Sequence, residues 1–190
     1  IRVDVVWDDF NNMHSTRPAS VGVQLFQNGG LSAYATAPVL STVNTHTFTA
    51  PRYDASLIPF VYTVDYVAPV SGYTAAITGN ADSGFVITFT LIRQFDLDVT
   101  VVWDDYSDLL GRRPATITVG IFRNGSPFQM QNVATVSAPV NRQTVTFIDM
   151  PRYDAMGNIY TYTAVQQAIP GGFYYAPQIS GFTITNRIFD

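Results

Sequence analysis

Short stretches of alternating apolar and polar residues run along the whole chain. At its start, Val3, Val5 and Trp7 occupy every second position, with Arg2 and Asp4 between them. A period of two residues is typical of a strand that buries one face. The pattern predicts strands at residues 3–7, 21–25, 31–37, 45–49, 60–67, 73–77 and 85–91, and at 97–103, 116–123, 128–134, 144–148, 160–166, 174–179 and 182–188.

The stretches are separated by turn residues such as Asn28-Gly29, and no stretch has the period of an amphipathic helix. Seven short strands in each half of the chain, with turns between them, are typical of a β-sandwich. The sequence therefore predicts an all-β protein.

The second half of the chain repeats the first. Val-Val-Trp-Asp-Asp stands at residues 5–9 and again at 101–105, and each copy holds one of the two tryptophans. Pro-Arg-Tyr-Asp-Ala at residues 51–55 returns at 151–155. The offset grows from 96 to 100 between these landmarks, as loops of different length would produce. The chain is therefore expected to contain two homologous domains.

We place the domains at residues 1–94 and 95–190. No Gly/Ser- or Pro-rich linker separates them, so the joint is expected to be short and to suit a rod. The chain begins with Ile1 rather than Met, and we expect it to be part of a longer polypeptide that holds any export signal or anchor.

The composition excludes several kinds of protein. All ten basic residues are Arg, all fourteen acidic residues are Asp, and Lys, Glu and Cys are absent. A chain without Cys has no disulfide and no thiolate chemistry. The net charge of −4 and the lack of a basic cluster argue against nucleic acid. No apolar run approaches the roughly 18–20 residues that would predict membrane insertion.

The landmarks together resemble a known family. In order they are V-x-W-D-D, a polar loop, R-P, a strand ending in N-G, P-x-Y-D, Y-T-V, G-Y and a closing I-T-N. This series is similar to the Cna B-type repeat of Gram-positive surface proteins, over nearly the full length of both halves. The resemblance implies a prealbumin-like, inverse immunoglobulin-like β-sandwich. It also implies a stalk or spacer role in cell-wall-anchored adhesins and pilins.

Several of the landmark residues are expected to have a structural role. In the Pro-Arg-Tyr-Asp loops we expect the Tyr to pack under the loop and the Arg and Asp to pair locally. The residues assigned to the structural motif are Trp7, Asp8, Arg17, Pro18, Tyr53 and Asp54, and their counterparts Trp103, Asp104, Arg113, Pro114, Tyr153 and Asp154.

Many members of the family carry a self-formed isopeptide bond between a Lys and an Asn, assisted by a buried acid. This chain has no Lys, so the resemblance predicts two domains without that bond, held by packing alone. Val in the lysine position instead contributes about 1.5–3 kcal/mol of apolar burial. The lysine, asparagine and acid positions fall on Val5, Phe89 and the Asp65-Tyr66 pair in the first domain, and on Val101, Asn186 and Gln166 in the second.

The paired aspartates at 8–9 and 104–105 allow two interpretations. Clustered carboxylates can bind calcium, but their spacing matches no EF-hand loop. The favoured interpretation is that one Asp of each pair accepts hydrogen bonds from loop amides, with no metal and no cofactor. The sequence also has no glycine-rich phosphate loop, catalytic carboxylate pair or nucleophile elbow, so we expect no enzyme activity.

The first function that we infer is a non-catalytic spacer in an extracellular, cell-wall-anchored adhesin or pilin, with neighbouring repeats of the same polypeptide as its partners. The alternative is an adhesive module that contacts a host surface protein or glycan. That module would use the aromatic residues Phe173, Tyr174 and Tyr175, which have fewer counterparts in the first domain. Strand alternation favours placing two of these three in the core.

Overall fold

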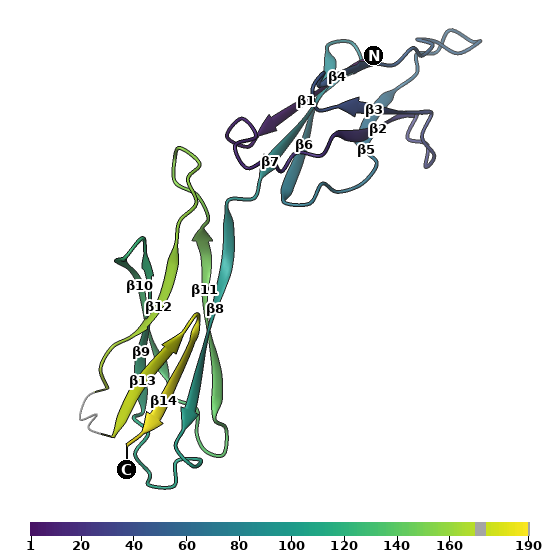
Figure 1. The fold of residues 1–190 in the computed structure, drawn as a ribbon. Coiled ribbons are helices and arrows are strands. Elements are labelled where there is room, and N and C mark those ends of the chain that lie inside the picture. Colours follow the sequence, from purple (N-terminus) through teal and green to yellow (C-terminus); the bar gives the residue numbers. More distant parts are fainter. Residues whose placement is uncertain (170–173, 190) are drawn as a thin grey trace. The chain divides into compact units, whose positions relative to one another are not determined.

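The computed structural model describes residues 1–169 and 174–189, and the chain divides into two compact units, Ile1–Ile92 (unit 1) and Arg93–Asp190 (unit 2) (Figure 1). The described residues form strands and loops and no helix. Unit 1 contains β1 (Arg2–Asp8), β2 (Ser20–Gln27), β3 (Ala35–Leu40), β4 (Thr45–Thr47), β5 (Tyr62–Tyr66), β6 (Tyr73–Asn80) and β7 (Gly84–Leu91). Unit 2 contains β8 (Gln94–Asp104), β9 (Thr116–Arg123), β10 (Ser126–Ala134), β11 (Arg142–Pro151), β12 (Tyr162–Gln166), β13 (Tyr175–Ser180) and β14 (Thr183–Ile188).

Each unit is a sandwich of a four-stranded and a three-stranded sheet. In unit 1 the strand orders are β4-β1-β7-β6 and β3-β2-β5, and in unit 2 they are β11-β8-β14-β13 and β10-β9-β12. The first and last strands of each unit lie side by side and parallel at the centre of the larger sheet, whereas all other pairs are antiparallel. The all-β prediction, with two tandem sandwiches, is confirmed.

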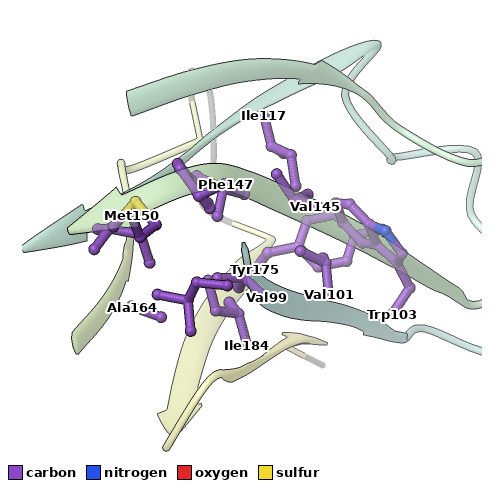
Figure 2. Close-up of a cluster of buried hydrophobic side chains, with 13 residues drawn as sticks. Val99, Val101, Trp103, Ile117, Val145, Phe147, Met150, Ala164, Tyr175 and Ile184 are labelled. Atoms are coloured by element: carbon purple, nitrogen blue, oxygen red, sulfur yellow. The ribbon is translucent and has the colours of Figure 1, made fainter. Parts of the chain in front are cut away.

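The core of unit 2 lies between its two sheets and follows the alternation of the sequence (Figure 2). Val99, Val101 and Trp103 point inward from β8, and Ile184 joins them from β14. Phe147, on β11, is fully buried against them. The smaller sheet contributes a matching inward row, which includes Ile117, Val119, Ile121 and Ala164.

One predicted strand of unit 1 is displaced. We expected a strand at 31–37, directly after the Asn28-Gly29 turn, but β3 runs from Ala35 to Leu40. Residues 30–34 form a loop in which Leu31 is fully exposed. In unit 2 the equivalent turn leads straight into β10, whereas in unit 1 the chain also pairs back on β2 but only from Ala35, opposite Leu25.

Unit 2 has a β-bulge near the end of β11, the strand that pairs with β8. In unit 2 the pairing of β11 with β8 shifts between Phe147 and Met150, and Asp149 has a φ of 54°. The Asp149 N–H donates to the Asp96 carboxylate at 3.1 Å. Residues 147–151, which contain the bulge, are one residue longer than the matching segment 48–51 of unit 1. This extra residue accounts for the last step in the offset between the two repeats, from 99 to 100.

Candidate functional site

The alternation of β1 extends beyond the tryptophan and buries a carboxylate at the end of the strand. Val3, Val5 and Trp7 face inward, and the next residue on that face is Asp9, which is 1% exposed. Arg17 returns from the loop and binds Asp9 through two bonds, Nε to Oδ2 and Nη2 to Oδ1, both 2.6 Å long. This two-point pairing neutralises a charge that would be costly to bury alone.

Unit 2 repeats the pair with deeper burial. Arg113 donates from Nε and Nη2 to the two oxygens of Asp105, and both distances are 2.7 Å. The Arg113 side chain is 4% exposed, compared with 16% for Arg17. Nη1 of Arg113 also donates to the carbonyls of Val136 and Val140, at 3.2 and 2.7 Å. The guanidinium of unit 2 is therefore the more completely enclosed of the two.

A tyrosine and a loop amide complete each carboxylate. Tyr73 donates its hydroxyl to Asp9, and Tyr175 donates to Asp105, each at 3.0 Å. The N–H groups of Asn12 and Asp108 donate to the same carboxylates, also at 3.0 Å. We call each set of Asp, Arg and Tyr the Asp–Arg–Tyr network: residues 9, 17 and 73 in unit 1, and residues 105, 113 and 175 in unit 2.

The network shifts the pKa of its members. The hydrogen bond from Arg17 lowers the pKa of Asp9, against an opposing effect of burial. At Asp105 burial raises the pKa, but the bonds from Arg113, Asp108 and Tyr175 together outweigh it and the net direction is downward. Burial, reinforced by the adjacent carboxylate, raises the pKa of the Tyr175 hydroxyl. Both carboxylates are therefore charged at neutral pH and both tyrosines remain donors.

The tryptophans lie against this network. The guanidinium of Arg17 is 5.6 Å from the Trp7 ring centroid, and that of Arg113 is 5.4 Å from the Trp103 centroid. Trp7 donates from Nε1 to the Asn44 side chain at 3.2 Å. The equivalent Asn141 accepts from Arg113 instead, and within the described residues Trp103 Nε1 is buried without a partner. The two repeats thus use the same asparagine differently.

The structure corrects the assignment of Asp8 and Asp104 to the structural motif. Both are exposed, and Asp104 pairs at the surface with Arg187 at 2.7 Å. The aspartates that the fold buries are their neighbours Asp9 and Asp105, which share the inward face with the tryptophan. Arg17 and Arg113 do lie in the motif, and the carbonyl of Pro18 accepts a 2.5 Å bond from Ser41; Pro114 follows Arg113 in the same loop.

The positions that the resemblance assigns to the cross-link hold an amide pair in unit 2. Asn186, on β14, is fully buried, and its Oδ1 accepts a bond from Gln166 Nε2 at 2.7 Å. Asn186 Nδ2 returns a bond to Gln166 Oε1 at 3.1 Å. Val101 is also fully buried and lies on the adjacent parallel strand, where Trp103 is opposite Asn186. The polar atoms of both amides that face each other are therefore paired.

The same positions of unit 1 are apolar. Phe89 is 1% exposed and packs against Tyr66 with ring centroids 5.7 Å apart. Phe89 also stacks on Trp7 at 4.9 Å, and Val5 is 3% exposed. The adjacent Asp65 is exposed, so of the Asp65-Tyr66 pair it is Tyr66 that lies against Phe89.

The Pro-Arg-Tyr-Asp loops are organised differently from the prediction. Asp54 accepts from the N–H groups of Ser56 and Ile58 at 2.8 and 2.9 Å, and Asp154 accepts from Met156 and Asn158 at the same distances. The bonds from Asn158 and the loop amides lower the pKa of Asp154. These aspartates therefore close their own loops.

Arg52 pairs outside its own loop, and the tyrosines of both loops are not fully covered. Arg52 forms an exposed ion pair with Asp82 at 3.2 Å rather than with Asp54. Tyr53 is 48% exposed. Its backbone forms an isolated antiparallel β-bridge with Pro59, as that of Tyr153 does with Ile159. The expected local Arg–Asp pair and the packing of Tyr53 beneath the loop are therefore corrected.

The aromatic trio of the alternative function divides between core and surface. Tyr175 is 5% exposed and belongs to the Asp–Arg–Tyr network. Tyr174 is 40% exposed, with the Arg112 guanidinium 4.8 Å from its ring centroid. Phe173 lies outside the described residues.

The described part of the chain offers neither a metal site nor a membrane-spanning helix. No group of three or more His or Asp side chains is placed to hold a metal ion. No helix there is long and apolar enough to span a membrane.

Comparisons with known proteins agree with this architecture. The family model described as the Cna protein B-type domain matches residues 1–90 and 97–187. The collagen adhesin of Staphylococcus aureus is 29% identical over 184 residues, and the match spans 95% of this chain but only 15% of the adhesin.

The chain is also similar to several solved structures. Two B repeat units of the S. aureus collagen binding protein are 30% identical, with a TM-score of 0.46 and coverage of 98% of this chain and 48% of that one. A single B repeat unit of the same protein is 26% identical, with a TM-score of 0.42 and coverage of 100% and 98%. The pilus adhesin SpaC of Lactobacillus rhamnosus GG is 15% identical, with a TM-score of 0.40 and coverage of 95% and 21%. From the family match over nearly its whole length, the chain belongs to the Cna protein B-type domain family.

Proposed function

We propose that the two units are structural spacer repeats of an extracellular, cell-wall-anchored surface protein, and that neither contains a Lys–Asn cross-link. The observation that supports this most strongly is the content of the three cross-link positions. Unit 2 holds Val101 with the Gln166–Asn186 amide pair, and unit 1 holds Val5 with the aromatic pair of Tyr66 and Phe89.

The chemistry of these residues does not form an amide bond between side chains. Isopeptide formation needs an amine that attacks a carboxamide carbon and an acid that moves the protons. Valine provides no nucleophile, and the Gln166 amide neither accepts nor releases a proton at neutral pH. In unit 1 the carboxamide is itself replaced, by Phe89. The sites are filled by groups that pack or hydrogen-bond.

Other features support a spacer role. Only Ile92 and Arg93 separate the last strand of unit 1 from the first strand of unit 2. Each unit has its own core and its own Asp–Arg–Tyr network, so each is stabilised independently. The S. aureus relative is a collagen adhesin of which this chain matches a small part, 15% of its length, and a spacer repeat fits that share.

The test combines mass with force. Intact-mass measurement is expected to give the full sequence mass, without the loss of one ammonia for each isopeptide bond. Unit 1 has 92 residues, so its fully extended contour length is about 300 Å at roughly 3.4 Å per residue. In single-molecule stretching, its unfolding should lengthen the chain by this contour length minus the end-to-end length of the folded unit. A bond between the first and last strands would lock almost the entire unit, so truncated extensions or a missing ammonia would refute the proposal.

The second candidate function, adhesion through unit 2, is favoured by one surface feature. Tyr174 is exposed beside Arg112, and Tyr106, Leu109 and Leu110 in the neighbouring sequence are 74%, 75% and 60% exposed. Aromatic and apolar side chains of this kind can contact a host protein or stack on a sugar. The test is binding to immobilised collagen and to a glycan array, with Tyr174→Ala as the variant and Tyr34→Ala, at a tyrosine of similar exposure (45%) in unit 1, as the control. Binding that Tyr174→Ala leaves unchanged would remove Tyr174 from this function.

A further inference from the structure

The sheets of the two units end in edge strands, whose outer sides present backbone N–H and C=O groups that can pair with another chain. The edges are β4, β6, β3 and β5 in unit 1, and β11, β13, β10 and β12 in unit 2. β4 has only three residues. The middle residues of β5 and β12, Val64 and Ala164, are 7% and 3% exposed, so these two edges are covered.

Proline interrupts two more edges. The Phe189 N–H donates to the Tyr174 carbonyl at 2.8 Å, and bonded positions alternate along an antiparallel pair. The alternation turns Pro177 of β13 away from β14, and a proline there leaves the outer side without an N–H. Pro38 lies on the outer side of β3 by the same alternation.

Glutamine side chains close the edges of β10 and β11 against each other. Gln143, on β11, donates from Nε2 to the Ala134 carbonyl of β10 at 3.0 Å. Gln131, on β10, donates from Nε2 to the Thr146 carbonyl of β11, also at 3.0 Å. The outer carbonyls of both strands are therefore occupied within unit 2.

β6, the last strand of the larger sheet of unit 1, has none of these protections (Figure 1). Its eight residues, Tyr73–Asn80, include no charged residue and no proline. The Ile92 N–H donates to the Gly72 carbonyl at 2.8 Å, so the alternation turns the N–H and C=O groups of Ala75 and Ile77 away from β7. Within the described structure, the backbone of these two residues has no hydrogen bond on that side.

The sequence of β6 also fits an antiparallel copy of itself. With Ala76 of both copies at a two-fold axis, Ala75 lies opposite Ile77 of the second copy, and each such pair can exchange two backbone hydrogen bonds. Thr74 then lies opposite Thr78 of the second copy on the outer face. No like charges meet, and residues 76–80 are all exposed, so the strand is accessible.

We propose that β6 is an interface through which a second copy of this chain pairs edge to edge, so that the larger sheets of two copies of unit 1 form one continuous sheet. The unpaired N–H and C=O groups require another extended backbone, and the uncharged side chains of β6 are complementary to themselves across a two-fold axis. β13 does not pair in this way, because Pro177 stands two residues after Tyr175 where Ala75 stands two residues after Tyr73.

The first test is sedimentation equilibrium of the full 190-residue chain over a range of concentrations. We expect reversible dimers, and Ala75→Pro should weaken them by about tenfold or more, because it removes one outer N–H from each copy. The substitution copies Pro177 and breaks no bond to β7, so the unfolding midpoint, followed by Trp7 fluorescence in a Trp103→Phe background, should be retained. A chain that stays monomeric at every concentration would overturn the proposal and leave the edge to an extended segment of another protein. Dimers that the folded Ala75→Pro variant forms equally well would also overturn it.

The second test uses the exposed residue at the axis. Ala76→Arg and Ala76→Asp should each dissociate the dimer, because two like charges would lie opposite each other, and an equal mixture of the two variants should restore it. Gln178→Arg, at the matching exposed position of β13, is the control and should leave the dimer unchanged. If the mixture remains monomeric, or if Gln178→Arg dissociates the dimer as strongly, the two copies do not pair through β6 and the proposal fails.

Discussion

Asp105→Asn is expected to destabilise unit 2 by about 3–5 kcal/mol, the usual range when one partner of a buried ion pair is removed. The substitution keeps the shape of the side chain but leaves the Arg113 guanidinium, 4% exposed, without its counter-charge. Two of the bonds donated by Arg113 end on this carboxylate, and so does the hydroxyl bond of Tyr175. A loss of this size is a large fraction of the 5–15 kcal/mol that stabilises a typical domain.

The two tryptophans allow each unit to be measured separately. Each lies beside its own network, so denaturant unfolding followed by fluorescence reports on unit 2 in a Trp7→Phe background and on unit 1 in a Trp103→Phe background. Asp9→Asn in unit 1 should cost less than Asp105→Asn, because Arg17 is 16% exposed and water can solvate it more easily.

A matched control is available next door in the sequence. Asp104→Asn removes the ion pair with Arg187, in which the Arg187 side chain is 57% exposed and the Asp104 side chain 50%. Because the pair is at the surface, its loss should change the free energy of unfolding by only about 0–1 kcal/mol. A loss below about 1 kcal/mol for Asp105→Asn, or an equal loss for Asp104→Asn, would show that burial of the pair does not set its contribution.

Three further outcomes are expected. Gln166→Leu should destabilise unit 2 by about 1–3 kcal/mol, because the buried Asn186 amide loses its partner. The double variant Gln166→Leu/Asn186→Leu should recover part of that loss, which a double-mutant cycle would measure. Phe147→Ala should cost about 3–5 kcal/mol whereas Ile148→Ala, at a 64% exposed neighbour, should be close to neutral in the same denaturation assay. Asp9 and Asp105 both have a pKa in the folded state below the ordinary 3.8, so the stability they add is present above that pH and is lost as the pH falls through the folded pKa. The denaturant midpoint of unfolding should therefore be flat near neutral pH and decrease below about pH 4. Asp105→Asn should reduce this acid dependence in unit 2.

Local patterns in the sequence were sufficient for the sandwich and for the inward face of the first strands. Val3, Val5 and Trp7 are where the alternation puts them, and the same period of two extended by one step would have selected Asp9 over Asp8. The sequence motif alone does not separate the two aspartates, because both follow the tryptophan. Only the face of the strand distinguishes them.

Contacts over long distances in the chain were not predictable in the same way. Tyr73 reaches Asp9 across 64 positions and Tyr175 reaches Asp105 across 70, and these contacts depend on which strands become neighbours. The different partners of Asn44 and Asn141 depend on side-chain orientations of a few ångströms, which no periodicity encodes. The difference between the predicted strand at 31–37 and β3 has a local cause. The loop at 30–34 lies between the turn and the strand, so pairing with β2 begins only at Ala35, opposite Leu25.

The parallel pairing of the first and last strands determines how each unit responds to tension applied at its two ends. β1 pairs with β7 from Val3 opposite Phe85 to Asp8 opposite Thr90, and β14 pairs with β8 from Thr183 to Arg187. Because the strands run in the same direction, pulling the start of one against the end of the other slides them lengthwise, and their hydrogen bonds are loaded together rather than broken one by one. If no covalent bond joins this pair, as we propose, a unit that is stretched beyond its limit opens completely, lengthens the chain and dissipates the work, and it can refold when the tension falls. Such a pair of repeats would act as an extensible, reusable tether rather than as an inextensible one.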